Sequence, residues 1–124
     1  MDEKMFKERT KRLALAVIRM VGKFPRSVVA DAVGRQIVRS ATSVGANYRA
    51  ACRSKSTADM INKLEVVEEE CDETAYWLEL IVEANLFAKE MVAPLAKEAD
   101  EILAMTVASL KTLRARQANS NRKS

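Results

Sequence analysis

The sequence predicts an all-α protein folded as an antiparallel, up-down-up-down four-helix bundle. The 124-residue chain contains only 3 glycines and 2 prolines, too few for a fold rich in turns. Alanine, leucine, glutamate, lysine and arginine dominate, and all five favour helices. Apolar side chains recur three and four residues apart in four segments. Short connections join these segments, which favours antiparallel neighbours around one core.

The first two predicted helices cover the N-terminal part of the chain. The first runs from about residue 3 to residue 21, and Gly22 and Pro25 mark its exit. The second runs from about residue 27 to residue 53. On a helical wheel its core face is formed by Val33, Ile37, Ala41, Val44, Tyr48 and Ala51.

The third and fourth predicted helices begin at local sequence signals. Ser56 and Asp59 resemble the start of a capping box, and the third helix continues from there to about Asn85. The fourth helix begins between Lys89 and Pro94, because proline is tolerated only near the first turn of a helix. Both segments carry a continuous apolar line, so both are expected to pack against the core.

The four helices are predicted to form a single domain over residues 1–116. The remaining residues, 117–124, read QANSNRKS and are polar and basic. We expect them to be a disordered tail, because chain ends without apolar side chains have nothing to hold them against the fold.

Charge is unevenly distributed along the chain, whose formal net charge is +4. Residues 1–55 hold 13 basic and 4 acidic side chains, residues 56–90 hold 2 and 10, and residues 91–124 hold 6 and 3. Basic and acidic helices could lie side by side and neutralise each other. Alternatively, part of the basic surface remains available to an anionic partner.

The residue types exclude several classes of function. Histidine is absent, which removes histidine-based acid–base catalysis, Ser-His triads and the usual Glu-x-x-His di-iron site. Cys52 and Cys71 fit no zinc spacing, and we interpret both as reduced thiols of a cytoplasmic protein. No apolar run reaches the ~20 residues that span a bilayer, and the charged N-terminus is unlike a secretory signal. We therefore predict no enzymatic activity, no cofactor, no metal and no membrane partner.

Two glycines stand inside the second predicted helix, where each costs roughly 1 kcal/mol relative to alanine. Gly34 and Gly45 share one flank of the helix with Ala41 and Cys52, which together form a seam of small side chains. Such a seam lets another helix backbone come close, and the closer packing of the two helices offsets the lost propensity. The opposite flank is polar. It includes Asn47, whose half-buried amide must find a partner and could bond across to another helix or another subunit.

Four arginines share the remaining face of the second helix, over about 27 Å at ~1.5 Å per residue. No acidic residue lies among them in the sequence. Arginine suits bidentate contacts with carboxylate or phosphate, so two interpretations stay open. Either the arginines pair with the acidic third helix, or they bind phosphate groups. The four residues are Arg35, Arg39, Arg49 and Arg53.

The third helix has more apolar surface than one core requires. Val66 and Trp77 lie beside its core stripe, and Glu70 borders that stripe and so calls for a cationic partner. Further burial through oligomerisation is therefore expected. The other carboxylates of this helix mostly face away from the core, which indicates a solvated acidic surface rather than a metal cluster. The candidate helix-packing or interface residues are Gly34, Gly45, Asn47, Glu70, Glu73 and Trp77.

Residues 36–81 carry a more specific pattern. Its elements are Gln36-x-x-Arg39, Ser43-Val44-x-Ala46-Asn47-Tyr48-Arg49, Ser56-x-x-Asp59, Lys63-Leu64, Glu70-x-x-Glu73-Thr74 and Trp77-Leu78. This pattern resembles the four-helix-bundle family that includes proteins encoded in intervening sequences of 23S ribosomal RNA. Accessory proteins of diversity-generating retroelements are related to it. The chain departs from the residues usual in the family at Ala50, Met60 and Glu69.

The resemblance implies a homopentameric ring of four-helix bundles with a basic surface suited to nucleic acid. Through the retroelement relatives it also implies binding to nucleic acid and to a reverse transcriptase. For the ribosomal intervening-sequence type, it implies no defined function.

Two hypotheses for function follow. In the first, the protein is a non-enzymatic homo-oligomer that binds the RNA or DNA backbone through the four arginines, together with the basic ends of the first and fourth helices. In the second, it is a scaffold that docks another protein, and its arginine face pairs with Glu70 and Glu73 inside the oligomer. Replacing the arginines by alanine separates the two, because the first predicts lost nucleic-acid binding and the second predicts lost oligomer stability.

Overall fold

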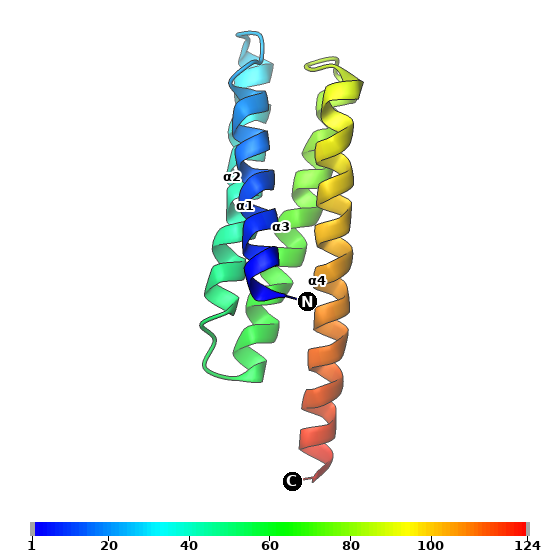
Figure 1. Cartoon of the computed structure of the whole chain (residues 1–124). Helices are drawn as coiled ribbons and strands as arrows, with labels where there is room; N and C mark the ends of the chain where they lie inside the picture. The colour runs from blue at the N-terminus through cyan, green and yellow to red at the C-terminus, as the bar shows by residue number, and fades with distance from the viewer. Residues whose placement is uncertain (1, 124) are drawn as a thin grey trace.

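The structure is a computed structural model that describes residues 2–123, and four α-helices account for most of them (Figure 1). No β-strand occurs among these residues, so the all-α prediction is confirmed. All four helices begin within a residue or so of their predicted starts. They are α1 (Glu3–Val21), α2 (Val28–Ala51), α3 (Thr57–Glu83) and α4 (Lys89–Lys123).

Side-chain caps determine where three of the helices begin. The Asp2 carboxylate accepts a hydrogen bond from the backbone N–H of Lys4 at 2.9 Å, and Ser27 caps α2 in the same way. The Ser56 hydroxyl accepts one from the N–H of Asp59 at 3.1 Å, which confirms the predicted start of α3. These bonds satisfy N–H groups that have no partner inside their own helix.

A left-handed residue ends α3. Asn85 has a φ of 58°, a conformation that asparagine tolerates better than most residues. The N–H of Leu86 then donates to the carbonyl of Ile81 at 2.9 Å, and the N–H of Asn85 donates to that of Val82 at 3.1 Å. This pair of bonds is a Schellman motif, and it stops the helix where the sequence predicts.

The helices each bury one stripe of side chains in a shared core. The rings of Phe6 in α1 and Tyr48 in α2 lie with their centroids 4.3 Å apart. Leu64 of α3 has no exposed surface. Polar groups also lie in the core: the hydroxyls of Thr74 in α3 and Ser40 in α2 share a bond of 3.0 Å. Interior polar atoms therefore join the helices without breaking the apolar core.

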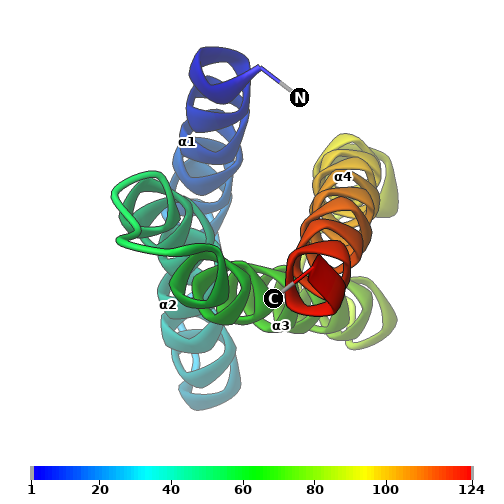
Figure 2. The ribbon, with the colours of Figure 1, turned by 90° about the horizontal axis from the view of Figure 1, so that it is seen from below.

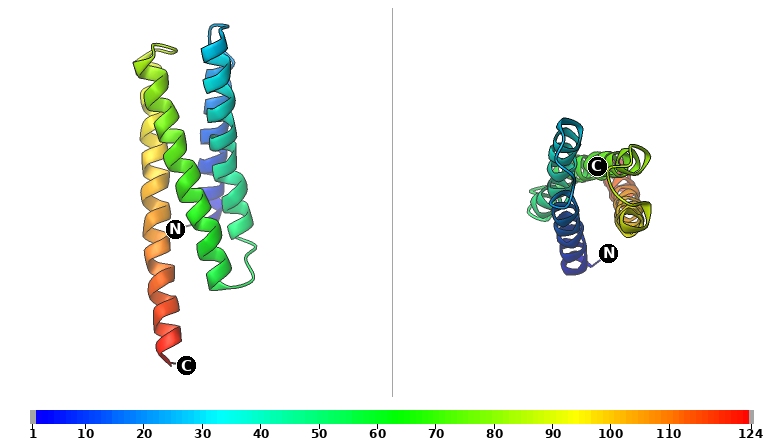
Figure 3. Two further views of the ribbon diagram at one scale, coloured as in Figure 1. Left: turned by 180° about the vertical axis from the view of Figure 1, so that it is seen from behind. Right: turned by 90° about the horizontal axis from the view of Figure 1, so that it is seen from above.

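The views together show how the helices are arranged. The α1–α2 and α3–α4 connections lie at one end and the α2–α3 connection at the other (Figure 1). From behind, α3 lies between α2 and α4 and packs against both (Figure 3). Seen from below, α1 and α4 stand on the same side of the α2–α3 pair (Figure 2). α1 begins at about mid-height, close to the level at which α2 ends, so the lowest part of the structure is built from the start of α3 and the end of α4 (Figures 1 and 3).

One polar bridge spans α1 and α4. The Arg9 guanidinium donates to Glu98 at 2.6 and 2.9 Å and to Glu101 at 3.1 Å. Its third contact is the Met105 sulfur at 3.3 Å. The Arg9 side chain is only 18% exposed, so the pair is largely shielded from water. Hydrogen bonding from Arg9 lowers the pKa of the Glu98 carboxyl.

This bridge predicts a loss of stability in acid. A carboxyl whose pKa is lower in the folded state adds stability above its unfolded pKa of ~4.3, and that stability disappears as the pH falls through its folded pKa. Glu98→Gln should therefore lower the urea midpoint more at pH 7 than at pH 3. Equal losses at both pH values would show that Glu98 acts through packing and not through its charge.

The C-terminal end of α4 differs from the prediction. The structure places residues 117–123 in α4 instead of a disordered tail, so the helix extends beyond the predicted limit at residue 116. Residue 124 lies outside the described part. No glycine or proline follows Pro94, and the backbone therefore meets nothing that interrupts its i to i−4 bonds. The tail was predicted from its lack of apolar side chains, which shows that these turns do not pack against the core. A helix that has already formed can continue without such packing.

Candidate nucleic-acid interface

Arg39 is paired with α3 of its own chain. Its guanidinium donates to Glu70 at 3.0 Å and also to Glu73. The same Glu73 oxygen accepts a hydrogen bond from the indole N–H of Trp77 at 2.9 Å. The Trp77 bond, followed by the Arg39 bond, lowers the pKa of the Glu73 carboxyl. At this arginine the structure therefore shows the pairing interpretation, with Glu70, Glu73 and Trp77 in one cluster.

The other three arginines are arranged differently. Arg35, Arg49 and Arg53 are exposed, and none of them forms an ion pair with any acidic residue between 2 and 123. Arg35 and Arg49 project from α2, while Arg53 lies just past its end. The four-arginine set predicted from the wheel thus divides into one neutralised residue and three that remain available to an external anion.

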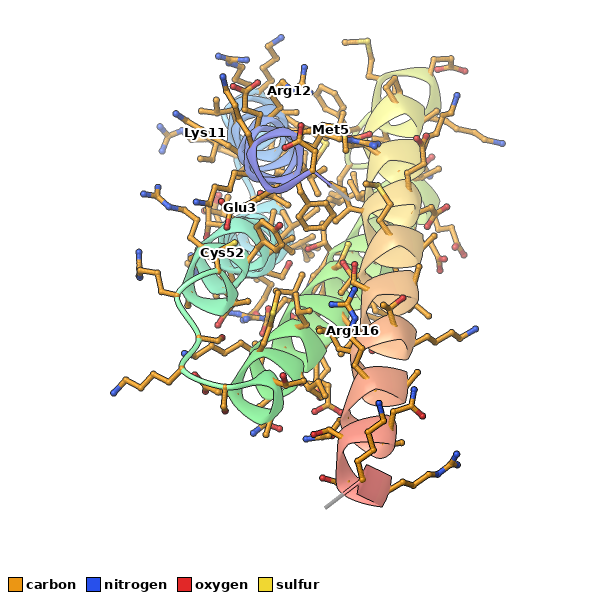
Figure 4. The ribbon with its side chains drawn as sticks, turned by 60° about the horizontal axis from the view of Figure 1, so that its bottom comes forward. Glu3, Met5, Lys11, Arg12, Cys52 and Arg116 are labelled. Atoms are coloured by element: carbon orange, nitrogen blue, oxygen red, sulfur yellow. The ribbon has the colours of Figure 1, made fainter. Side chains whose placement is uncertain are left out.

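Two lysines of α1 extend this positive surface. Lys7, Lys11 and Arg49 line one shallow hollow between α1 and α2, with Thr42 of α2 between them and Glu8 as its acidic member. Lys11 points away from the bundle (Figure 4). Lys7 lies 3.8 Å from Glu3, a long contact open to solvent that holds little of its charge. We call the five cations Lys7, Lys11, Arg35, Arg49 and Arg53 the basic face.

A second hollow lies at the other end of the basic face. Arg26 and Arg35 line it together with Phe24, Asp31 and the paired Arg39. Arginine in a solvent-exposed hollow can donate two parallel hydrogen bonds to one phosphate or carboxylate. The cations are therefore spread along the α1–α2 side, and not gathered at one point.

The α2 glycines decide how closely these two rows of cations approach. A Cβ added at Gly45 would lie 3.2 Å from the Thr10 hydroxyl, and one at Gly34 would lie 2.9 Å from Val21 Cγ1. Both glycines therefore face α1 or its exit. The seam of small side chains brings the two backbones together and sets Arg49 beside the lysines of α1.

Gly34→Ala is expected to destabilise the protein despite the better helix propensity of alanine. The new methyl group would meet a stiff, β-branched valine inside contact distance, so the net loss should be ~1–2 kcal/mol. Gly45→Ala should cost less, because its nearest neighbour lies farther away. Urea unfolding measures both variants. A Gly34→Ala protein more stable than the wild type would contradict the close approach.

Asn47 and Trp77 lie on the α2–α3 side. The Asn47 amide donates to the carbonyl of Ser43 at 2.9 Å and to its hydroxyl at 2.8 Å, both within α2. The bonds that do cross from α2 to α3 are the hydroxyl bond between Ser40 and Thr74 and those of Arg39 to Glu70 and Glu73. Trp77 is half-buried and packs against the core cluster. Asn47 thus braces its own helix, and Trp77 fills space beside the Arg39 pair.

An acidic hollow lies between α3 and α4, formed by Glu65, Glu68, Glu69 and Asp72 around Leu103 and Val107. One of its carboxylates is neutralised, since Arg114 of α4 donates to Glu65 at 2.9 Å. Among residues 2–123, no group of three or more cysteine and carboxylate side chains is arranged to hold a metal ion. Basic and acidic surfaces therefore belong to different helix pairs. Within the same residues, no helix combines the length and apolar character needed to cross a bilayer.

Sequence reasoning included the basic end of the first helix without naming Lys7 or Lys11. It did not anticipate the bridge from Arg9 to Glu98. A signal existed for the lysines, which stand four residues apart on one side of α1. The sequence of either helix alone does not show which side of α2 these two lysines approach.

The fold and this surface define a class: small four-helix proteins with a basic face and no metal-binding cluster among residues 2–123. The chain belongs to the 23S rRNA-intervening sequence protein family, whose model matches residues 3–108. The expected family resemblance is thereby confirmed.

A solved structure supports the same relationship. It is the crystal structure of a protein of unknown function from the S23 ribosomal protein family of Bacteroides thetaiotaomicron. The two chains are 30% identical, and the match covers 90% of this chain and 99% of the other with a TM-score of 0.79. No curated protein matches the sequence. These descriptions assign neither a reaction nor a ligand, so the function has to be argued from the surface.

Proposed function

We propose that this protein binds the sugar-phosphate backbone of RNA or DNA through the basic face, without catalysing a reaction. The observation that carries the proposal is the junction of α1 and α2. There Lys7, Lys11 and Arg49 line one hollow, and Arg49 has no ionic partner among residues 2–123. Phosphates repeat along a nucleic-acid strand, and a row of cations along two helices matches such a repeat.

The mode of binding follows from the side chains present. Lysine and arginine contact phosphates irrespective of sequence, while base recognition in single strands needs stacking on aromatic rings. The exposed Tyr76 is on α3, away from the hollow formed by Lys11 and Arg49. Phe24 in the second hollow is half-buried and packs against Phe87, with the ring centroids 5.9 Å apart. The proposed interaction is therefore sequence-independent and salt-sensitive.

We further propose that the chain is an antiparallel bundle that assembles into a homopentameric ring. The helix connections lie at alternate ends of the structure, which supports the antiparallel arrangement (Figure 1). Large apolar side chains left on the surface of α3, Val66 at 36% and Tyr76 at 53% exposure, support burial against another copy. Repeating a weak phosphate-binding face around a ring raises avidity through effective concentration.

Fluorescence anisotropy with labelled single-stranded RNA, duplex RNA and duplex DNA at two salt concentrations tests the proposed function. We expect micromolar or tighter binding that weakens with salt, because bound cations release counterions from the phosphates. The variant Arg35→Ala/Arg49→Ala/Arg53→Ala should lose binding and keep its oligomeric state. Absence of binding at low salt would rule out the nucleic-acid role.

Arg39→Ala is the matched comparison. Because Arg39 is already paired with Glu70 and Glu73, its removal should change affinity for nucleic acid less than the loss of any one of the other three arginines. Its expected effect is instead a small loss of stability, because solvent screens a half-exposed pair.

The scaffold hypothesis remains the second candidate, because the Arg39 cluster supports it. In that case the α2–α3 surface around Arg39 and Trp77 is structural, and the ring presents a docking face to another protein. It predicts that Arg39→Ala weakens the oligomer. The nucleic-acid proposal predicts instead that the oligomer survives this change.

A further inference from the structure

The lower end of the structure contains an apolar groove that none of its own helices fills. Tyr48 and Cys52 of α2, Met60 of α3, and Met105 and Leu113 of α4 line it, and Glu3 closes its upper end. We call this the terminal groove. It begins where α1 begins and α2 ends, because Glu3 and Cys52 both line it and only the start of α3 and the end of α4 extend lower (Figure 1).

The position of the terminal groove between helices indicates which kind of structural element could bind in it. α1 packs mainly against α2, and seen from below its N-terminal end stands apart from α4 (Figure 2). The terminal groove is the open lower part of the space between α1 and α4, where Cys52, Met60 and Leu113 are half-exposed. A helix placed there would pack between α1 and α4 and bury these side chains.

The charges around the groove indicate the chemistry of the partner. Figure 4 shows Arg116 on α4 at one wall of the groove and Glu3 on α1 at the other. Arg116 has no ionic partner among residues 2–123. Lys123 is seven residues farther along and so lies on the same side of α4. The acidic side chain that lines the groove, Glu3, belongs to α1. On the groove side of α4, Arg116 and Lys123 are both positive.

We propose that the terminal groove binds an acidic amphipathic helix of a partner protein. Its apolar stripe would cover Met60, Met105 and Leu113, and its acidic flank would face Arg116 and Lys123. Methionine-lined grooves suit this role, because the flexible thioether side chains adapt to the knobs of an incoming helix. This site is separate from the basic face, and the proposal stands whether or not that face binds nucleic acid.

The methionines also provide the test. Met60 and Met105 line the groove, while Met20 is in the core and Met91 is exposed near the start of α4. The protein labelled with ¹³C at the methionine methyls is titrated with a synthetic helix of about 14 residues, ~21 Å long, bearing a leucine stripe flanked by glutamates. We expect the Met60 and Met105 signals to shift and the Met20 and Met91 signals to stay in place.

Variants and a second peptide make the test specific. A peptide with lysine in place of each glutamate should bind at least ~10-fold more weakly. Arg116→Glu should remove that difference, whereas Arg122→Glu on another side of α4 should preserve it. Ala108→Trp, which fills the groove from an exposed position, should abolish binding. Ala93→Trp, at an exposed position near the other end of α4, should not.

Three outcomes would overturn the proposal. One is the absence of shifts at Met60 and Met105 with the acidic peptide. Another is a shift of these signals with protein concentration alone, because a second copy of the chain would then occupy the groove. The third is displacement of the peptide from wild-type protein by a short RNA that shifts the same two methyl signals, because the groove would then belong to the nucleic-acid surface.

Discussion

Phe6→Ala is expected to remove ~3–5 kcal/mol from the free energy of unfolding. Phe6 has no exposed surface, and its ring lies against that of Tyr48, with the two centroids 4.3 Å apart. It belongs to the first turn of α1, at the N-terminal end of that helix. Truncation would leave a cavity beside Tyr48, and the neighbouring side chains can only partly fill it.

The loss is large against the whole stability of a small domain, which is typically ~5–15 kcal/mol. Urea unfolding followed by circular dichroism measures it. Met5→Ala is the matched control, because the neighbouring side chain is 38% exposed and should cost less than ~1 kcal/mol. Similar losses for the two variants would show that the N-terminal turns of α1 are not packed as the structure has them.

Lys11→Glu/Arg49→Glu is expected to weaken binding to duplex RNA by about 100-fold or more at 0.1 M salt. The two residues come from different helices and line the same hollow, so the double variant replaces two adjacent cations by two anions. Two phosphate contacts are lost, which also reduces the slope of log affinity against log salt by about 2. The two added carboxylates then repel the strand.

A variant with the same charge change elsewhere separates position from net charge. Lys89→Glu/Lys97→Glu makes an equal change at two exposed positions of α4. It should reduce the affinity only slightly, because at physiological salt a charge acts over ~8 Å. Equal losses for the two double variants would mean that binding depends on overall charge, and the basic face would then have no particular role.

Local signals in the sequence were sufficient to predict the helices. Ser56 predicted the start of α3, and the structure shows its hydroxyl capping that helix. Asn85 marked the end of α3, and there it takes the left-handed conformation that stops the helix. Caps and stops act over three to five residues, so the information they require lies within one short segment.

Prediction from local sequence signals was less successful for features that depend on tertiary contacts. Residues 117–123 were expected to be disordered because nothing in them could pack, yet they continue α4. Lys11 of α1 and Arg49 of α2 are 38 positions apart, and neither neighbourhood shows that they will share a hollow.

By itself, the sequence determined the four helices, their buried stripes and the excess of positive charge in the first half of the chain. Only the tertiary structure decided which arginines are available: Arg39 meets Glu70 and Glu73 across the α2–α3 contact, whereas Arg49 meets lysines across the α1–α2 contact. The physical reason is that helix periodicity fixes the face on which a side chain lies, while the partner opposite that face is fixed by packing between distant segments.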